Sequence, residues 1–454
     1  MLSNRHAYLP FFRTRRYGFT LFKSLSNMVG DASLMGIRFD IIPGAQNQEV
    51  SFDEDGTSRV SLNFVEEPLG LPGSKGFGWP QLEFGQKIGP ALRYEIKRKL
   101  GWGMNSSTWL AYDAHTNDYV AVKVLKGHST QLSRDKRIWE NQALRRVAAD
   151  SHCLRLLNEF THPGKASSGD HLCFVTPVYG GDVKSLWAEH QHFPLPLAKR
   201  MLLHTLRGIA SAHGREVIHT DLKHDNVFYT TPLSRHDIDA LLLSDPSRRN
   251  PPEASLDGLV SSAVTQPLPV PSLDDAVKCD YLLADFGSAQ LFDKPKEDEV
   301  TSLPLRAPEV LLLGRWDEKV DIWAFGCLIF EFVVGRSLFR HEGHKDPKTD
   351  ITLDETAYHL YQMNCFTGEV DFPPEVLQYS RLASKYFNAD CTFNHSLPLH
   401  YYPIIVQIHR SKKLESYEIV KSTADIIHRC LVLSPDERPT AAELLNDPWF
   451  LGVE

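Results

Sequence analysis

The sequence HTDLKHDN at residues 219–226 places two aspartates, a lysine and an asparagine close together. A second short stretch, ADFG, adds Asp285 after an apolar run. Transfer of a phosphoryl group requires positioning and neutralisation of negative charge more than covalent chemistry. Asp221 can accept a hydrogen bond from a hydroxyl nucleophile, Lys223 can balance charge on a γ-phosphate, and Asn226 and Asp285 carry the oxygen ligands that Mg²⁺ prefers. A polar turn without function would explain each residue singly, but not all four in this order.

The composition limits the classes of protein to which the chain can belong. With 454 residues, 42 % of them hydrophobic, it can bury a large core, and we expect two lobes or domains plus extensions. The net charge of −8 argues against direct nucleic-acid binding and favours basic partners or substrates. No apolar run approaches the roughly 18 residues that span a bilayer, so we expect no membrane association. Seven dispersed cysteines without a CxxC pair indicate reduced thiols of an intracellular protein.

The N-terminal part of the chain differs from the remainder. Residues 1–30 interleave Arg and Lys with Phe, Tyr and Leu and contain no acidic residue, which is the composition of a mitochondrial transit peptide. A disordered basic extension is the alternative. We expect a protein of the cytoplasm and nucleus, or of the mitochondrion if residues 1–30 act as a transit peptide. Residues 31–93 are rich in Gly, Pro and acidic residues with little periodicity, which predicts an extended lead-in.

Residues 94–180 have the pattern of a small lobe that is mostly β. Two alternating segments flank a glycine turn, and residues 118–126 predict a third strand. Helical spacing over 131–149 predicts a helix, and the apolar run at 171–179 predicts a further buried strand.

Residues 181–450 have the pattern of a larger helical lobe. An apolar helix is predicted over 197–214, where a glycine ends it, and a buried helix over 322–335. Residues 231–278 are punctuated by prolines and rich in Ser and Asp, which predicts a disordered insert. The whole pattern predicts an α+β fold with a small β-rich N-lobe at 94–180 and a larger α-helical C-lobe.

The glycine-rich stretch GWGMNSS at 101–107 lies between two predicted strands. A dinucleotide-binding turn would need a strand followed at once by a helix, so that interpretation is excluded. The stretch VAVK follows at the distance of the next strand and places Lys123 beneath the glycine-rich loop. Glu140 begins an apolar helical face and needs a cation there, because burial of a lone carboxylate is costly. Lys123 is the predicted partner; a surface position for Glu140 is the alternative.

Together these motifs resemble those of eukaryotic protein kinases of the serine/threonine type, over residues 94–450. The matching pieces are GWGMNSSTW, VAVK with Lys123, Glu140, HTDLKHDN, DFG, APE with Glu309, DIWAFG with Asp321, and RPTAAELLNDPWF. The stretches KLGWGMNSSTWLA, HTD and RAPEVLLLG further resemble the serine/arginine-rich-protein kinases, in the group that includes cyclin-dependent and MAP kinases. Residues 341–425 resemble the extra helical insert of that group.

The resemblance implies a two-lobed protein kinase fold that uses ATP and Mg²⁺. It implies that Lys123 holds the α- and β-phosphates and that Glu140 holds Lys123, with Asp221 and Lys223 as the other catalytic residues. It also implies that Glu309 pairs with Arg438 and that Asp321 braces the catalytic loop. Asn226 and Asp285 are the implied metal ligands. The nucleotide is expected to contact Leu100, Gly101, Gly103, Ser106, Thr108, Ala121, Lys123, Thr176, Val178, Tyr179 and Phe228.

Some residues depart from the family pattern. Thr108, Pro177 and Phe228 alter the expected adenine pocket, and they leave a pseudokinase that acts as an ATP-binding or scaffolding module as the alternative to an active enzyme. Thr220 stands where many kinases carry an arginine that pairs with a phosphate on the activation segment. The sequence therefore predicts an enzyme that is active without that modification.

The resemblance also implies protein substrates, in particular Arg/Ser-rich splicing-type proteins, and we expect a monomer. As a hypothesis, four acidic residues attract arginine-rich substrates. The alternative is that they form a solvated acidic loop without this role. They are Asp346, Asp350, Asp354 and Glu355.

Overall fold

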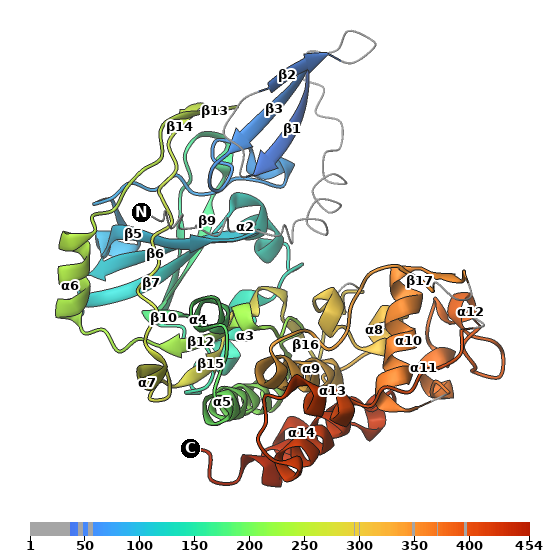
Figure 1. Cartoon of the computed structure of the whole chain (residues 1–454). Helices are drawn as coiled ribbons and strands as arrows, with labels where there is room; N and C mark the ends of the chain where they lie inside the picture. The colour runs from blue at the N-terminus through green and yellow to red at the C-terminus, as the bar shows by residue number, and fades with distance from the viewer. Residues whose placement is uncertain are drawn as a thin grey trace, which may run out of the picture.

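The structure is a computed structural model. It describes residues 37–43, 49–52, 58–294, 296–298, 300–346, 350–369, 371–394 and 397–454, with side chains from residue 62 onward. The predicted transit peptide at 1–30 lies outside the described residues, as do parts of the lead-in. Figure 1 shows a β-rich lobe in blue and cyan above a helical lobe that runs from green to red. The predicted α+β architecture with two lobes is confirmed.

An antiparallel sheet forms the body of the N-lobe, with the described strands in the order β4-β5-β6-β7-β9-β8. Alternate residues of β5 point into the core, where Tyr94 and Ile96 pack with Trp109 and Val122. The strands are β4 (Lys87–Ile88), β5 (Tyr94–Trp102), β6 (Ser106–Asp113), β7 (Asp118–Leu125), β8 (Asn158–His162) and β9 (His171–Pro177).

The single helix predicted over 131–149 is two helices, and that prediction is wrong in this respect. They are α2 (Gly127–Arg134) and α3 (Glu140–Val147). Between them Lys136 has a φ of +55°, a left-handed conformation that interrupts helical geometry. The break turns α3 so that Glu140 lies inward, on the same face as the buried Leu144.

The lead-in is more organised than an extended segment. Strand β3 (Ser58–Phe64) pairs in parallel with β1 (Ile37–Pro43) and antiparallel with β2 (Glu49–Phe52). The chain then makes a short 3₁₀ turn at Gly73–Lys75. A small apolar cluster lies beneath, formed by Leu62, Phe64, Leu69, Leu71, Trp79 and Val260.

The C-lobe is built around helix α9 (Lys319–Val334), which is buried from Val320 to Val334 and matches the helix predicted over 322–335. Helix α5 (Leu195–His213) matches the helix predicted over 197–214 and packs against α9. The remaining helices are α4 (Val183–His190), α8 (Pro308–Leu311), α10 (Glu355–Thr367), α11 (Pro374–Gln378), α12 (Ala383–Tyr386), α13 (Ile404–Ser411), α14 (Tyr417–Cys430) and α15 (Ala441–Leu444).

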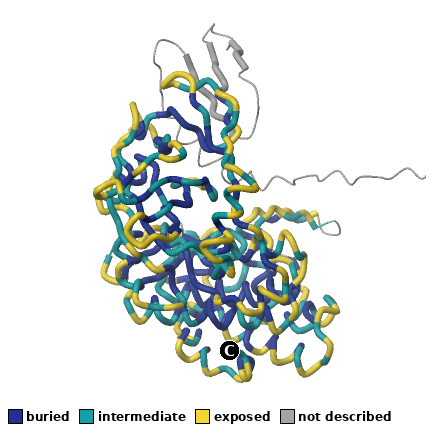
Figure 2. The backbone as a smooth tube through the Cα atoms, turned by 90° about the vertical axis from the view of Figure 1, so that its left-hand side faces the viewer, coloured by how far each residue is buried: buried dark blue, intermediate teal, exposed yellow. Residues whose placement is uncertain are grey.

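Short strands carry the functional loops of the C-lobe. They are β10 (Tyr179–Asp182), β11 (Val217–Ile218), β12 (Val227–Thr230), β15 (Tyr281–Leu283) and β16 (Gln290–Leu291), with β17 (His344–Lys345) and β18 (Thr352–Leu353) farther along the chain. The strand order β10-β12-β15 places the ends of β12 and β15 side by side. Figure 2 shows that the buried backbone runs through the centre of both lobes.

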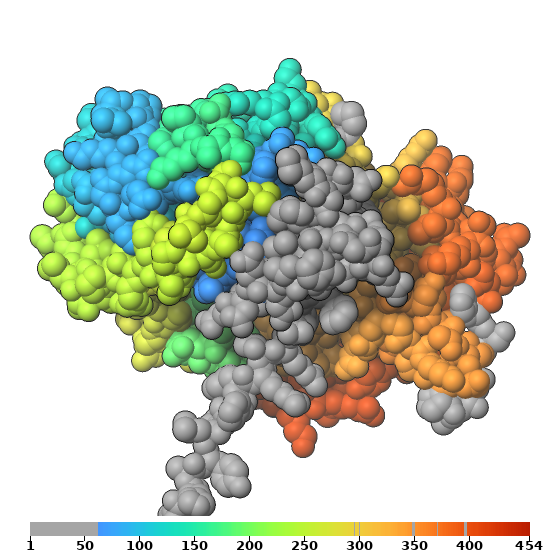
Figure 3. All heavy atoms as spheres, turned by 90° about the horizontal axis from the view of Figure 1, so that it is seen from above, coloured from blue at the N-terminus to red at the C-terminus, as the bar shows by residue number. Residues whose placement is uncertain are grey.

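The predicted disorder of residues 231–278 is wrong. This insert contains helix α6 (Arg235–Ser244), the hairpin of β13 (Glu253–Ser255) and β14 (Gly258–Val260), and helix α7 (Leu273–Ala276). A capping box between Ser234 and Asp237 begins α6. Figure 3 shows the yellow-green insert lying against the blue surface of the N-lobe.

The insert is ordered because the N-lobe supplies the contacts that its own sequence lacks. The backbone N–H of Gln266 donates to the carbonyl of Lys99 at 2.9 Å. The hydroxyl of Ser255 donates to the carbonyl of Leu69 at 2.6 Å. Val260 belongs to the apolar cluster of the lead-in. A composition that is polar and rich in proline does not reveal such partners, because they lie far away in the sequence.

Among the described residues, no helix combines the length and the apolar character needed to cross a membrane. All seven cysteines are free thiols, and all but Cys391 are buried.

Candidate active site

Lys123 lies between two carboxylates where the lobes meet. Its Nζ donates to Glu140 Oε1 at 2.5 Å and to Asp285 Oδ1 at 2.8 Å. Lys123 comes from β7 and Glu140 from α3, both in the N-lobe, whereas Asp285 follows β15 in the C-lobe. The predicted pair of Lys123 and Glu140 is present in the structure, and Glu140 is buried.

These charges change one another's pKa values. Burial alone would lower the pKa of Lys123, but the carboxylates of Asp285 and Glu140 outweigh it and raise that pKa. The ammonium of Lys123 lowers the pKa of Asp285 to about 2. Burial raises the pKa of Glu140, although Lys123 opposes this. Lys123 is therefore protonated and Asp285 is ionised at neutral pH.

The catalytic loop brings three predicted residues together. Lys223 Nζ donates to Asp221 Oδ2 at 2.6 Å. The amide nitrogen of Asn226 donates to the backbone carbonyl of Asp221 at 2.7 Å and to its Oδ2 at 3.0 Å. Burial would lower the pKa of Lys223, but the charge of Asp221 outweighs it and raises that pKa. The loop thus holds a carboxylate, an ammonium group and an amide within hydrogen-bonding distance of one another.

Asp321, at the start of α9, supports this loop from below. Its Oδ2 accepts the backbone N–H of His219 and its Oδ1 accepts that of Thr220, each at 2.8 Å. The ring of His213 lies 2.9 Å from the same Oδ2. The bracing contact that the resemblance implied for Asp321 is present. His213 was missed from the sequence; its only signal is a polar residue at the end of an apolar helix, just before the loop.

Asp285 is held in an unusual backbone conformation. Its φ of +55° is left-handed, and its Oδ1 accepts the backbone N–H of Gly287 at 3.3 Å. The adjacent Phe286 is buried, with its ring centroid 5.1 Å from that of His219. His219 also bonds through Nε2 to the carbonyl of Ala284 at 2.9 Å. These contacts fix the direction of the Asp285 carboxylate relative to the catalytic loop.

Asn226 and Asp285 form a donor set that fits Mg²⁺. The backbone N–H of Ala284 donates to the carbonyl of Asn226 at 2.8 Å, which places the two segments side by side. The amide nitrogen of Asn226 is used for Asp221, so its amide oxygen remains as the ligand atom. An ionised carboxylate and an amide oxygen are hard oxygen donors of the kind that Mg²⁺ prefers.

The residues predicted to contact the adenine lie where the N-lobe sheet meets the hinge, the connection between β9 and β10 that joins the lobes. Ala121 in β7 lies opposite Thr176 in β9, and Thr176 Oγ1 donates to the carbonyl of Pro177 at 3.0 Å. Leu100 and Val178 pack against one apolar cluster that also includes residues of α6. From the C-lobe side, the rings of Tyr179 and Phe228 lie 6.3 Å apart between centroids.

The glycine-rich loop connects β5 and β6. Gly101 lies opposite Thr108, and Thr108 lies opposite Lys123 in the next strand pair. Thr108 is half-buried, so its hydroxyl is not sealed in the core. The backbone N–H of Gly103 donates to the carbonyl of Ser106 at 2.9 Å and closes the turn. The predicted loop residues therefore lie on the strands next to Lys123.

Farther along the C-lobe, Glu309 and Arg438 form the ion pair that the resemblance implied. Two parallel bonds join the guanidinium to the carboxylate, at 2.6 and 2.8 Å, and both side chains are buried. Arg438 also lies over the ring of Trp323, 5.0 Å from its centroid.

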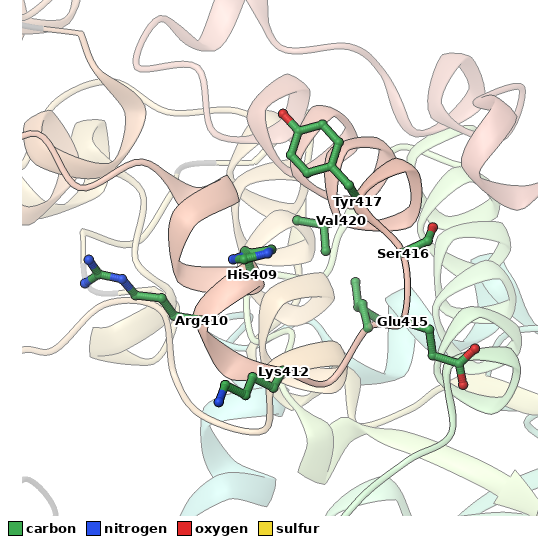
Figure 4. Close-up of a pocket in the computed structure, with 8 residues that line it drawn as sticks. His409, Arg410, Lys412, Glu415, Ser416, Tyr417 and Val420 are labelled. Atoms are coloured by element: carbon green, nitrogen blue, oxygen red, sulfur yellow. The ribbon is translucent and has the colours of Figure 1, made fainter.

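A surface hollow of about 500 Å³ lies between α13 and α14 (Figure 4). Its lining includes none of the candidate site residues. It is lined by His409, Arg410, Lys412, Leu414, Glu415, Ser416, Tyr417 and Val420.

The geometry agrees with comparison to known proteins. The family model described as protein kinase domain matches residues 94–245 and 273–450. The chain belongs to the protein kinase family. The family model passes over residues 246–272, which lie within the ordered insert.

Curated relatives refine this assignment. The serine/threonine-protein kinase SRPK of Physarum polycephalum is 29 % identical over 406 residues, covering 81 % of this chain and 88 % of the relative. Protein kinase dsk1 of Schizosaccharomyces pombe is 24 % identical, and the match covers 90 % of this chain and 89 % of that kinase. Serine/threonine-protein kinase AFC3 of Arabidopsis thaliana is 26 % identical, and the match covers 79 % of this chain and 82 % of that kinase. The chain is a serine/threonine protein kinase that resembles the serine/arginine-rich-protein kinases.

A solved structure shows the same fold. The crystal structure of the PF14_0431 kinase domain matches with a TM-score of 0.57 and 21 % identity, covering 82 % of this chain and 99 % of that one. The protein kinase fold predicted from the motifs is confirmed.

Proposed function

We propose that this kinase transfers the γ-phosphoryl group of ATP to serine or threonine hydroxyls of Arg/Ser-rich proteins. Protein phosphorylation by a serine/threonine kinase that uses ATP follows from membership of the family. The preference for Arg/Ser-rich substrates and the role of each site residue are what we propose.

In this proposal Asp221 accepts the hydrogen bond of the substrate hydroxyl and orients its oxygen toward the γ-phosphorus. Lys223, 2.6 Å from Asp221, balances charge on the transferred group. Lys123 binds the α- and β-phosphates, and Glu140 holds Lys123 in place. Asn226 and Asp285 would hold Mg²⁺, which supplies neutralisation of phosphate charge.

A group of carboxylates beside the catalytic loop supports a basic substrate. Glu331 lies in α9 with only 7 % of its surface exposed, and its Oε2 is 3.4 Å from His224 Nε2. The other ring nitrogen of His224 is 3.5 Å from Asp225 Oδ2. Burial raises the pKa of Asp182, and the nearby Asp225 raises it further.

The group has three carboxylates, those of Asp182, Asp225 and Glu331, but only two basic side chains pair with them in the described structure. Lys184 pairs with Asp225 at 2.5 Å, and His224 is the other basic group of the set. A buried carboxylate is stabilised by a cation that forms a second bond to it. An arginine of the substrate, next to the serine held by Asp221, would supply that cation. This is the observation that carries the proposed preference for arginine.

The acidic residues that the sequence suggested for this role are less suitable. Asp350 pairs with Lys345 at 2.7 Å. Asp354 caps α10 by accepting the N–H of Ala357 at 2.7 Å, and it also pairs with Lys385. The side chains of Asp350 and Asp354 are 85 % and 40 % exposed, against 7 % for Glu331, so water screens their charges more strongly. The group around Glu331 is therefore the better candidate.

Phosphorylation of matched peptides tests this proposal. We expect a peptide of Arg–Ser repeats to be phosphorylated with a higher kcat/KM than the corresponding Lys–Ser and Ala–Ser peptides. Glu331→Gln should lower kcat/KM for the Arg–Ser peptide about tenfold, the loss of one charge-assisted bond, and leave the Ala–Ser peptide unchanged. Asp350→Asn is the matched control and should change neither. Equal use of the three peptides by the unaltered enzyme would overturn the proposal.

The pseudokinase alternative has no support among the observations. The polar groups that phosphoryl transfer needs are present. Lys123 is hydrogen-bonded to Glu140 and Asp285, and Asn226 is hydrogen-bonded to Asp221.

A further inference from the structure

Trp79 of the lead-in contacts the glycine-rich loop directly. Its indole Nε1–H donates to the backbone carbonyl of Gly103 at 3.3 Å. Trp79 is 4 % exposed, whereas Gly103 and its neighbours at 102–105 form an exposed tip. The family model begins at residue 94, so this contact comes from outside the region that it describes.

The position of Trp79 is built by close backbone packing. The preceding Gly78 has a φ of +88°, and a Cβ there would lie 2.3 Å from the carbonyl oxygen of Ser168. The carbonyl of Gly78 accepts the backbone N–H of Gly127, at the start of α2, at 2.7 Å. A side chain at Gly127 would also collide with Ser168. The lead-in therefore docks on α2 in a register that glycine makes possible.

Lys126 connects Trp79 with the other side of the loop. Its ammonium lies 4.8 Å from the centroid of the Trp79 ring, a cation–π contact. Its backbone N–H donates to the carbonyl of Asn105 at 2.9 Å. The exposed tip is thus held at Gly103 by the indole and at Asn105 by the residue that packs on that indole.

The base of the loop is held by the same lead-in. Lys99, two residues before Gly101, is fully buried, and its ammonium pairs with Glu67 and, at 3.1 Å, with Glu66. The ammonium also donates to the carbonyl of Ala263 at 3.1 Å, so the insert contributes to the same anchor.

We propose that lead-in residues 66–79 brace the glycine-rich loop and that Trp79 is a positioning residue for the nucleotide. This rests on the proposed binding of ATP phosphates by that loop. A loop that must contact phosphates through its backbone loses conformational freedom when the nucleotide binds. The brace restricts the loop beforehand at its base and its tip, so less freedom is lost on binding and affinity for ATP is higher.

Trp79→Phe in the full chain tests the proposal. The phenyl ring keeps an aromatic face for Lys126 but cannot donate to Gly103. We expect the Kd for a non-hydrolysable ATP analogue with Mg²⁺, measured by calorimetry, to rise about three- to tenfold. We expect KM for ATP to rise with it, while KM for the peptide stays unchanged.

Trp449 supplies a matched control in the C-lobe. Its indole donates to Thr423 Oγ1 at 2.9 Å, and Lys199 lies 4.7 Å from its ring centroid. Trp449→Phe therefore removes the same kind of bond from the same kind of setting. We expect it to leave the Kd for nucleotide unchanged. An unchanged Kd in Trp79→Phe, or an equal rise in both variants, would overturn the brace.

A second pair of variants covers a failure of Trp79→Phe to fold. Lys126→Met should raise the Kd for nucleotide, and Lys199→Met should not; equal values for this pair would also count against the brace. Calorimetry needs no protein substrate, so a wrong substrate class would leave these results intact. Absence of nucleotide binding by the unaltered chain would instead refute the proposed function, and the brace with it.

Discussion

The hydroxyl of Thr220 donates to the backbone carbonyl of Ser288 at 2.8 Å. Thr220 belongs to the catalytic loop, and Ser288 begins the segment that leads from Asp285 toward Glu309. The backbone of Thr220 is left-handed, with a φ of +67°, and its N–H is bound by Asp321. A short neutral hydroxyl therefore joins the two segments directly, at a place where many kinases need an arginine and a phosphate.

This contact predicts an enzyme that is active without phosphorylation of its activation segment, the stretch between Asp285 and Glu309. Treatment with a phosphatase should leave most of the activity, measured as phosphate incorporation into a peptide. Mass spectrometry of the treated protein is the control for complete removal of phosphate. Loss of nearly all activity would contradict the prediction.

Asp221→Asn should separate chemistry from binding. The amide keeps the shape of the side chain but accepts the hydroxyl proton poorly, so kcat should fall about 100-fold or more. Stabilisation by ATP with Mg²⁺ should persist, because Lys123, Asn226 and Asp285 are unchanged. Thermal unfolding with and without nucleotide checks the second part. A variant that retains a tenth of the activity would show that Asp221 is not the group that orients the hydroxyl.

The buried pair of Glu309 and Arg438 predicts a large loss of stability when one partner is removed. Arg438→Met leaves a buried carboxylate without its cation, which costs about 3–5 kcal/mol. Denaturant unfolding measures this loss. The double variant Glu309→Leu with Arg438→Met removes both charges and should be less destabilised than Arg438→Met alone. An equal loss in the single and the double variant would indicate that packing, rather than the unpaired charge, dominates.

Glu67 and Glu66 should have opposite effects on the pH dependence of stability. Burial raises the pKa of Glu67 to about 7, so its contribution to stability is full below about 4.5 and is lost as pH rises through 7. The shift corresponds to about 3 kcal/mol. Burial also opposes ionisation of Glu66, but bonds from Thr265 and the charge of Lys99 lower its pKa, so its contribution is lost as pH falls below about 4.5.

Melting temperatures of two variants check this prediction. The difference between Glu67→Gln and the unaltered protein should move in favour of the variant from pH 5 to pH 8. The difference for Glu66→Gln should stay constant over that range and shrink between pH 5 and pH 3. The same trend in both variants would contradict the assignment.

The sequence predicted most of the catalytic side of the molecule. Motifs around Asp221 and Asp285 are local, because each is a few residues on one loop, and the need of a buried Glu140 for a cation identified Lys123. The broken helix at Lys136 was missed because helical periodicity does not report a single left-handed residue. The order of the insert was missed because its partners, such as Lys99 and Leu69, lie more than a hundred residues away.

The insert leaves the C-lobe after β12, packs along the N-lobe and returns to β15. The chain therefore joins the lobes by covalent paths at both ends of the insert as well as at the hinge between β9 and β10. Opening of the lobes must stretch this second connection or detach it from the N-lobe. We therefore expect release of nucleotide to be coupled to local unfolding of residues 246–266, so that protease cleavage within the insert slows when bound nucleotide keeps the lobes closed.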